Sequence, residues 1–390
     1  MALTRVAILG STGSIGRATL SVIARHTDRF QVVALCAHNS VADIAAQVVE
    51  HSVPLAVIAD PEALSGLDDL PAAEWRSGPA AVLEVVEDVN VDVVVNAIVG
   101  SVGLEATLAA LRAGKRLALA NKESLVAGGP LVIQAAREGG GELIPIDSEH
   151  SAILQCLEGH DPESVVRLVL TASGGPFRGL GPAELEVVGP EDALRHPTWD
   201  MGAKITVDSA TLANKALEVI EAHFLYGIDY EKIEAIVHPQ SIVHSFVEFN
   251  DGSVLAQLGF PTMELPILYA LSHPERLADA SLRTFDPLRS SPLTFEEIDR
   301  DRFGLFALGV EAGIRGGTAP AAFNAANEIA VQAFLSRDIR FVEMPEVVGR
   351  ALETVPVRNV ETVDDVLEAD AAARIAAREF VCSHRSLTGG

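Results

Sequence analysis

The chain has 390 residues, of which 48% are apolar, and a formal net charge of −25. This length predicts two or three domains, and the apolar content predicts substantial hydrophobic cores rather than disorder. The negative charge argues against nucleic acids and anionic membrane surfaces as partners, because both would repel the chain. An anionic substrate would need locally placed cations, which makes Lys122, Arg195, Lys204 and Lys215 of interest.

The three cysteines, Cys36, Cys156 and Cys382, are far apart and form no cluster with histidines in the sequence. This spacing predicts neither a structural zinc site nor a disulfide framework, and it fits a reducing cytoplasm. The chain enters a predicted strand within its first ten residues, so we expect no signal peptide. It contains no run of 18 apolar residues, so we expect no membrane span.

The first 150 residues alternate apolar strands with helices. We expect strands at 6–9, 31–36, 56–59, 91–98, 116–120 and 142–146, and helices at 15–25, 41–50, 79–87, 103–113 and 125–138. Nearly continuous apolar strands that alternate with helices are typical of a mainly parallel sheet. The sequence therefore predicts an α/β fold whose N-terminal domain, residues 1–150, is Rossmann-like and doubly wound.

The pattern changes after residue 150. We expect an α+β domain over 151–273, with strands at 165–171, 233–237, 241–249 and 253–258, the last two joined as a hairpin. Residues 274–300 have no clear period and are predicted to be a linker. Residues 301–390 are rich in alanine and are predicted to form a C-terminal helical domain. Its last helix is expected to bury one face, which carries Val363, Val366, Leu367 and Ile375.

Three glycines, Gly10, Gly13 and Gly16, stand between the first predicted strand and the first predicted helix. Glycines at such a junction allow a tight turn and close approach of the backbone to a pyrophosphate. The spacing is GxxGxxG rather than the usual GxGxxG. We interpret the loop as a dinucleotide site; a tight turn that binds no ligand is the alternative.

The turn after the second strand indicates which dinucleotide is bound. An acidic residue there would bind the ribose 2′-hydroxyl of NAD, but this chain has His38, Asn39 and Ser40. These side chains could donate hydrogen bonds to a 2′-phosphate, so NADP is favoured, although the turn has no Arg or Lys. Asn121 and Lys122 follow a later strand and should face the same crevice.

Asp147, Ser148 and Glu149 follow the apolar run 143–146. If the strand continues, residues 147 and 149 point to the same face and their carboxylates can converge. Carboxylate oxygens favour Mg²⁺ or Mn²⁺ over zinc. The alternative is that these acidic residues are only solvated.

The most informative segment is 204–221. We expect a short strand with Ile205 and Val207, followed by a helix that Asp208 and Ser209 open. Positions three and four apart share one face of a helix, so Asn214 and Lys215 should lie beside Glu218. Together, these groups suit a phosphate and a hard metal ion.

Nine segments resemble one known family. They are GSTGSIG (10–16), LANKESLV (119–126), PIDSEHSA (145–152), TASGGPF (171–177), HPTWDMG (196–202), VDSATLANKALEVIEA (207–222), VHPQSIVHS (237–245), DGSVLAQLG (251–259) and FNAANEIAV (323–331). Together and in this order they resemble 1-deoxy-D-xylulose 5-phosphate reductoisomerases over nearly the whole chain. The resemblance implies NADPH-dependent isomerisation and reduction of that ketose phosphate to 2-C-methyl-D-erythritol 4-phosphate, in the non-mevalonate isoprenoid pathway.

The resemblance also implies roles for individual residues. It implies one divalent metal ion, Mg²⁺ or Mn²⁺, held by Asp147, Glu149 and Glu218, and catalytic roles for these residues and Lys122. The implied substrate residues are Lys122, Ser148, Glu149, Ser173, His196, Trp199, Met201, Ser209, Asn214, Lys215 and Glu218. The cofactor residues are Gly10, Thr12, Gly13, Ser14, Ile15, His38, Asn39, Ser40, Asn121, Glu123 and Gly202.

Further expectations follow from the same resemblance. Residues 196–201 should act as a lid, and the α+β domain should carry the catalytic site and form a homodimer. Many family members have a basic residue near positions 38–40, and this chain departs from them there. Two rival functions are another NADP-dependent dehydrogenase with a Rossmann domain and a non-catalytic NADP sensor. A retro-aldol route and an α-ketol shift are both compatible with the residues.

Overall fold

The computed structural model describes residues 3–65, 69–199 and 201–388. Contacts between residues divide the chain into two compact units, each built from segments that are far apart in the sequence. The first unit comprises Met1–Ser124, Val132–Ser151 and Thr262–Arg283, and the second comprises Leu125–Leu131, Ala152–Pro261 and Thr284–Gly390. Within the described ranges, no helix has an apolar stretch long enough to cross a lipid bilayer.

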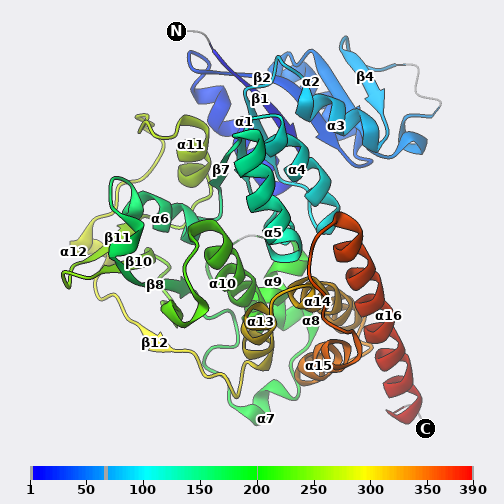
Figure 1. Cartoon of the computed structure of the whole chain (residues 1–390), viewed down its shortest axis with the longest axis vertical. Coiled ribbons are helices and arrows are strands. Elements are labelled where there is room, and N and C mark those ends of the chain that lie inside the picture. Colours follow the sequence, from blue (N-terminus) through cyan, green and yellow to red (C-terminus); the bar gives the residue numbers. More distant parts are fainter. Residues whose placement is uncertain (1–2, 66–68, 200, 389–390) are drawn as a thin grey trace. The chain divides into compact units, whose positions relative to one another are not determined.

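The first unit contains a seven-stranded parallel sheet in the order β4-β3-β2-β1-β5-β6-β7 (Figure 1). Its strands are β1 (Thr4–Leu9), β2 (Phe30–Ala37), β3 (Leu55–Ile58), β4 (Glu74–Ser77), β5 (Val93–Asn96), β6 (Arg116–Leu119) and β7 (Glu142–Pro145). The predicted doubly wound α/β fold is thereby confirmed. The strand β4 was not predicted, because its sequence, Glu-Trp-Arg-Ser, is mostly polar, as an edge strand permits.

The helices of this sheet follow its strands closely in the sequence. They are α1 (Ser14–Arg25), α2 (Val41–His51), η1 (Pro61–Leu64), α3 (Pro79–Glu87), η2 (Ser101–Gly103), α4 (Leu104–Arg112) and α5 (Lys122–Gly139), with α6 (Ser148–Leu157) after β7. The later helix α11 (Glu264–Ser272) returns to this unit and contacts α1. All seven strands are parallel, so the loops that follow them open at one edge of the sheet.

The second unit contains a five-stranded mixed sheet in the order β11-β10-β8-β9-β12. Its strands are β8 (Val165–Ala172), β9 (Ile233–Val237), β10 (Val243–Phe249), β11 (Val254–Leu258) and β12 (Glu296–Glu297). The antiparallel pairing of β10 with β11 confirms the predicted hairpin. Residues 274–300, the predicted linker, contain α12 (Pro287–Ser290) and β12, which pairs with β9. The short helices η3 (Pro162–Ser164), α7 (Pro182–Leu185), α8 (Pro190–Ala193) and η4 (Tyr230–Lys232) complete this part.

The prediction of a strand around Ile205 and Val207 was wrong. Residues 203–211 form the helix α9 (Ala203–Thr211), and Leu212, with φ of 59°, separates it from α10 (Ala213–Tyr226). Two apolar residues spaced by two are too few to distinguish a strand from a helix. The buried residues of α9 include positions 206, 207, 210 and 211, which is the spacing of one helix face.

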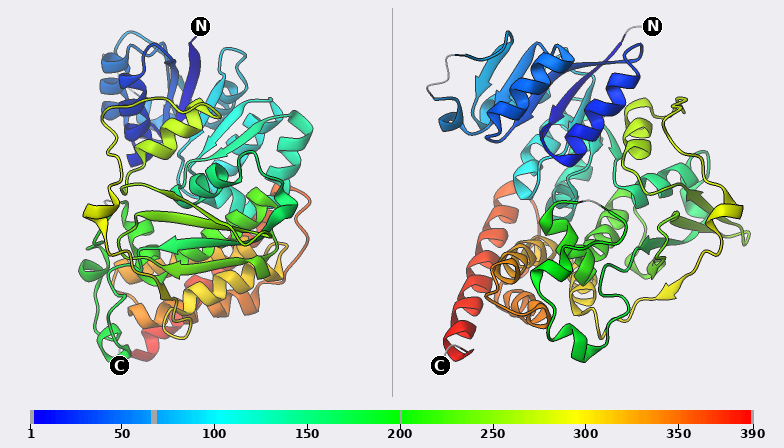
Figure 2. Two further views of the ribbon diagram at one scale, coloured as in Figure 1. Left: turned by 90° about the vertical axis from the view of Figure 1, so that its left-hand side faces the viewer. Right: turned by 180° about the vertical axis from the view of Figure 1, so that it is seen from behind.

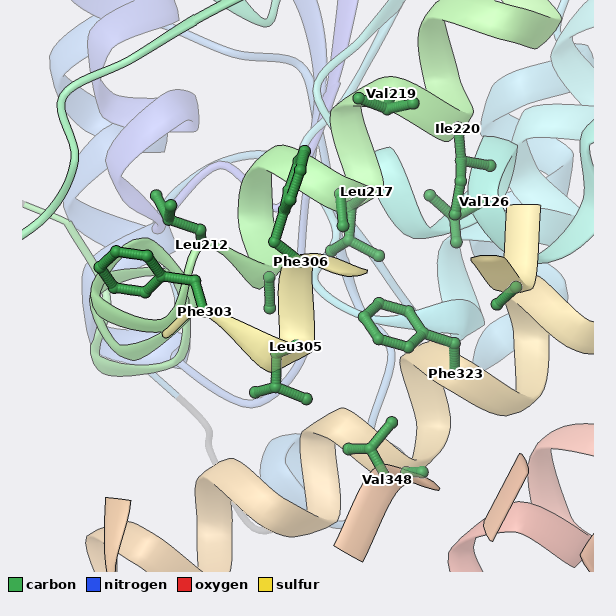
Figure 3. Packing of buried hydrophobic residues seen from close by; sticks show 14 of the residues in the cluster. Val126, Leu212, Leu217, Val219, Ile220, Phe303, Leu305, Phe306, Phe323 and Val348 are labelled. Atoms are coloured by element: carbon green, nitrogen blue, oxygen red, sulfur yellow. The ribbon is translucent and has the colours of Figure 1, made fainter. Parts of the chain in front are cut away.

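The C-terminal helices pack on one another and on α10. They are α13 (Gly304–Arg315), α14 (Ala319–Leu335), α15 (Met344–Thr354) and α16 (Val363–Thr388), with η5 (Phe341–Glu343) before α15. Figure 2 shows them in yellow to red. Figure 3 shows how the aromatic side chains of Phe303, Phe306 and Phe323 gather with Leu212 and Leu217 in the core of this unit.

The buried face of α16 differs from the predicted one. Val366 is buried as expected, but Leu367 is 44% and Ile375 is 56% exposed. The remaining buried residues are mainly alanines, at positions 369, 373 and 377, which repeat every four residues toward α14 and α15. Small side chains let helix axes approach closely, so this packing depends on the size of the side chains rather than on their hydrophobicity. The predicted face was wrong because it was chosen from the most hydrophobic residues.

Candidate active site

The loop between β1 and α1 has little room for side chains. A Cβ atom on Gly10 would lie 2.5 Å from the carbonyl oxygen of Ala97, and one on Gly16 would lie 2.4 Å from that of Gly10. Gly10 also has a φ of +80°. Gly13 and Ser14, by contrast, are exposed at the start of α1. The loop therefore presents the first backbone N–H groups of a helix to solvent, which suits a pyrophosphate.

The turn after β2 exposes the two predicted side chains His38 and Asn39, while Ser40 is half-buried. Arg17, which the sequence analysis did not select, lies on the first turn of α1. Its Nε donates a hydrogen bond of 2.8 Å to the carbonyl oxygen of Thr12, and its guanidinium is 3.2 Å from the Asp43 carboxylate. The only sequence signal for Arg17 was its position directly after the third glycine.

Asn121 caps the amino end of α5 and is almost fully buried. Its Oδ1 accepts a hydrogen bond from the Ser124 N–H, and its Nδ2 donates to the carbonyl oxygens of Ile98 and Gly100 and to the carboxylate of Glu123. The side chain of Asn121, which also contacts Glu123, therefore holds the loop after β5. This loop lies at the carboxyl edge of the sheet.

Lys122 and Asp147 form an ion pair with 2.7 Å between Nζ and Oδ2, and both side chains are largely buried. Glu149 offers a carboxylate oxygen within 4.8 Å of one from Asp147, and Ser148 donates a hydrogen bond of 2.7 Å to it. The expected strand continuation was wrong, because Ser148 and Glu149 form the first turn of α6. The helix turn nevertheless brings the two carboxylates together, with only oxygen ligands to offer.

In the second unit, Ser173, His196 and Ser209 come from three different segments and meet. The Nε2 atom of His196 lies 3.0 Å from the Ser173 hydroxyl and 3.1 Å from the Ser209 hydroxyl. Gly175 has a φ of +66°, and a Cβ there would lie 2.5 Å from the carbonyl oxygen of Ser209. The glycine thus allows the chain after β8 to pass close to the end of α9.

The other nitrogen of His196 holds the segment that follows it. Nδ1 accepts hydrogen bonds from the backbone N–H groups of Thr198, at 3.1 Å, and Trp199, at 2.9 Å. Because both partners are donors, Nδ1 must be unprotonated, and a neutral ring carries its proton on Nε2. Burial lowers the pKa of His196, which favours this neutral form.

Asn214, Lys215 and Glu218 lie together on α10, as the helical spacing predicts. The Glu218 carboxylate accepts hydrogen bonds from the Asn214 amide and the Lys215 ammonium. Lys215 and Glu218 are buried, with 4% and 1% of their surfaces exposed. A carboxylate offers about four lone-pair directions, so that of Glu218 can accept from several partners at once.

A buried pair joins α9 to α14. Asp208, next to Ser209, has no exposed surface; it accepts a hydrogen bond of 2.7 Å from the Asn327 amide and lies 2.9 Å from the Lys204 ammonium. From the sequence, Asp208 was expected to open a helix. The structure instead shows that it connects the helix that carries Ser209 to a C-terminal helix.

Three family models match the chain in sequence order. The model for 1-deoxy-D-xylulose 5-phosphate reductoisomerase matches residues 6–129, that for its C-terminal domain matches 143–226, and a further model for a DXP reductoisomerase C-terminal domain matches 258–376. The chain belongs to the 1-deoxy-D-xylulose 5-phosphate reductoisomerase family. A reductoisomerase from Cupriavidus necator is 51% identical over 387 residues, which cover 97% of this chain and 98% of the relative.

Solved reductoisomerase structures are similar over the same length. The enzyme from Zymomonas mobilis in complex with NADPH is 44% identical with a TM-score of 0.89, and the alignment covers 97% of this chain and 99% of that one. A reductoisomerase in complex with NADPH, fosmidomycin and magnesium is 38% identical with a TM-score of 0.91, and it covers 97% of this chain and 98% of its own.

In this reductoisomerase chain, the predicted lid leads directly into α9. Trp199 and Met201 are half-buried, and Gly202 is the exposed N-cap residue of the helix. The Thr206 hydroxyl donates a hydrogen bond of 2.9 Å to the Gly202 carbonyl oxygen. Asp200, which belongs to the same predicted segment, lies outside the described residues.

Proposed function

We propose that the protein converts 1-deoxy-D-xylulose 5-phosphate to 2-C-methyl-D-erythritol 4-phosphate with NADPH and a divalent metal ion. The observation that carries this proposal is the match to the reductoisomerase family over nearly the whole chain. A dehydrogenase of another family would need neither the paired carboxylates at 147 and 149 nor a phosphate cluster.

We propose that NADPH occupies the carboxyl edge of the parallel sheet, where it supplies the hydride for the reduction. The exposed backbone at Thr12, Gly13, Ser14 and Ile15 would bind the pyrophosphate, since the α1 amino end carries a partial positive charge. The close packing of Gly10 and Gly16 supports this role. The predicted residues His38, Asn39 and Ser40 would surround the adenosine ribose, and Asn121, Glu123 and Gly202 would border the nicotinamide side.

We propose that Asp147 and Glu149 of the first unit and Glu218 of the second hold one metal ion, either Mg²⁺ or Mn²⁺. All three offer only carboxylate oxygens, which suits these hard cations. When bound, the ion would act as a Lewis acid on adjacent substrate oxygens. Magnesium occurs in related reductoisomerase structures, and the manganese alternative rests on ligand chemistry alone.

The substrate phosphate is assigned to Ser173, His196, Ser209, Asn214 and Lys215. The hydroxyls of Ser173 and Ser209 and the Nε2–H group of His196 can donate hydrogen bonds to phosphate oxygens. Lys215 supplies a buried positive charge. Lys122 and Ser148 would contact the carbon backbone. Lys122 can donate a proton where negative charge develops on a substrate oxygen, with Glu149 as the partner that accepts one. Trp199 and Met201 would cover the substrate.

The decisive experiment follows NADPH absorbance with purified protein, 1-deoxy-D-xylulose 5-phosphate and Mg²⁺ or Mn²⁺. We expect oxidation that stops when EDTA removes the metal and resumes when either ion is added in excess. Oxidation that persists in EDTA would favour a metal-independent dehydrogenase. NADPH binding without any oxidation would favour the sensor, and both outcomes would overturn the proposal.

We also propose that two copies associate through β11, the edge strand of the five-stranded sheet. Val254 and Leu255 are 54% and 38% exposed there, and an apolar edge strand with free backbone groups favours pairing with another chain. Sedimentation velocity should give twice the mass of one chain, and Leu255→Lys should shift the protein to the monomer. Leu367→Lys, on the exposed face of α16, is the matched control. A monomeric wild-type protein would refute this assignment.

We place the enzyme in the cytoplasm. The support is compositional: the chain has only three cysteines, widely spaced, as expected of a protein that folds under reducing conditions. Fractionation of cells that produce it would test this, and recovery from an oxidising compartment would refute it.

A further inference from the structure

We infer that Arg17 binds the 2′-phosphate of the cofactor and thereby determines the preference for NADPH over NADH. This inference rests on the proposed function, because it assigns a residue to one group of the proposed cofactor. It concerns a position outside the turn at 38–40, where the sequence analysis looked for cofactor discrimination.

The turn after β2 lacks the charge that a phosphate needs. In this fold the adenosine ribose lies at the carboxyl end of the second strand. The side chains there are His38, Asn39 and Ser40, none of which is a lysine or arginine. A 2′-phosphate carries close to two negative charges, and arginine is the residue best suited to bind it, through several parallel hydrogen bonds.

Arg17 is held between the two loops that contact a dinucleotide. Its Nε–H group donates to Thr12 in the glycine loop, and its terminal nitrogen is 3.2 Å from Asp43, in the first turn of α2. Asp43 lies three residues beyond Ser40. The guanidinium therefore bridges the glycine loop and the segment that follows β2, and the ribose of a bound dinucleotide would lie beside this bridge.

The guanidinium is available to a ligand. Its side chain is 56% exposed, and that of Asp43 is 53% exposed. Arginine has five N–H donors, and the two contacts to Thr12 and Asp43 leave others for phosphate oxygens. Asp43 is the counterion of Arg17, so Asp43 should compete with a 2′-phosphate for the guanidinium.

Other basic residues of the first unit are placed less well. Arg5 lies near the amino end of β1 and is paired with Asp92, and Lys115 donates to the carbonyl oxygens of Asp88 and Val91. Arg76 is on β4, which β3 separates from β2, and it pairs with Glu74 and Glu84. Arg76 is therefore a suitable control: a paired, partly exposed arginine of the same sheet.

The test compares binding of NADPH and NADH to the full-length protein, without substrate, in wild type and in Arg17→Gln, Asp43→Asn and Arg76→Gln. Arg17→Gln should weaken NADPH binding at least about tenfold, while NADH binding changes less than about twofold. Asp43→Asn should leave NADPH binding unchanged or tighten it, because it removes the competing carboxylate. Arg76→Gln should change neither affinity.

Three results would overturn the inference. Equal weakening of NADPH and NADH by Arg17→Gln would show that Arg17 only supports the Thr12 loop. Unchanged NADPH binding in that variant would exclude the contact. Wild type that binds both dinucleotides equally would show that no residue discriminates between them. Failure of the proposed function can be told apart from failure of this inference. A chain that binds NADPH more tightly than NADH but never oxidises NADPH would refute the proposed reaction and leave the role of Arg17 intact.

Discussion

Replacing Glu218 with glutamine should lower kcat/KM for 1-deoxy-D-xylulose 5-phosphate by at least about 1000-fold, because the loss of a proposed metal ligand would remove several kcal/mol of transition-state stabilisation. The same change leaves the buried ammonium of Lys215 without its carboxylate partner. Excess metal could offset weaker metal binding but not the changed contact with Lys215, so it should restore little activity. The measurement is NADPH oxidation as a function of substrate and Mg²⁺ concentration.

The control for Glu218→Gln is Glu328→Gln. Glu328, on α14, also pairs with a basic residue, Arg374, at 2.6 Å in the second unit. This control removes a carboxylate from an ion pair without touching the proposed site, so its activity should remain within about threefold of wild type. An active Glu218→Gln variant with normal metal dependence would remove Glu218 from the metal site.

The second large effect should appear at His196, whose two nitrogens have different partners. In His196→Asn, the side-chain oxygen can still accept from the Thr198 and Trp199 N–H groups, but the proposed donor to the substrate phosphate is lost. We expect its KM for the substrate to rise about 10- to 100-fold, the usual cost of a hydrogen bond to a charged group. In His196→Gln, the amide can reach the phosphate but no longer holds Trp199, so KM should rise less.

Fluorescence separates the two roles of His196. Trp75 is the other tryptophan of the chain, so both variants should be made in a Trp75→Phe background, in which only Trp199 reports. Substrate analogue should still change the emission of His196→Asn at saturation, whereas His196→Gln should show a much smaller change. If both variants lose phosphate affinity and the fluorescence response together, the two nitrogens do not have separable roles.

Much of the first unit could be predicted because its strands are continuous apolar runs separated by helices. The positions of Gly10, Asn121 and Asp147 at strand ends follow directly from that alternation. The polar strand β4 could not be predicted, since nothing in Glu74–Ser77 distinguishes it from a loop. Arg17 could not be predicted as a cofactor residue, because in the sequence it stands on α1, far from the turn at 38–40, and only the folded chain brings it to Asp43, just beyond that turn.

In the second unit, the spacing of residues along the sequence predicts contacts within one helix but not contacts between separate segments. The grouping of Asn214, Lys215 and Glu218 is a property of one helix and follows from spacing alone. The meeting of Ser173, His196 and Ser209 depends on how three segments fold together, and only the family resemblance pointed to it. The contact between Asp208 and Asn327 was not predicted at all: the two residues are 119 positions apart in the sequence yet share a hydrogen bond of 2.7 Å.

That hydrogen bond connects α14 to the helix that carries Ser209, a proposed ligand of the substrate phosphate. Ser209 is the direct neighbour of Asp208, so we expect a change that displaces Asn327 to shift the helix that carries the Ser209 hydroxyl. We therefore expect some natural sequence changes in the last quarter of the chain to alter the affinity for substrate, even where the changed residue does not contact the substrate. If Ser209 binds the phosphate as proposed, selection for phosphate binding also acts on α14, a helix that does not contain any of the proposed phosphate residues.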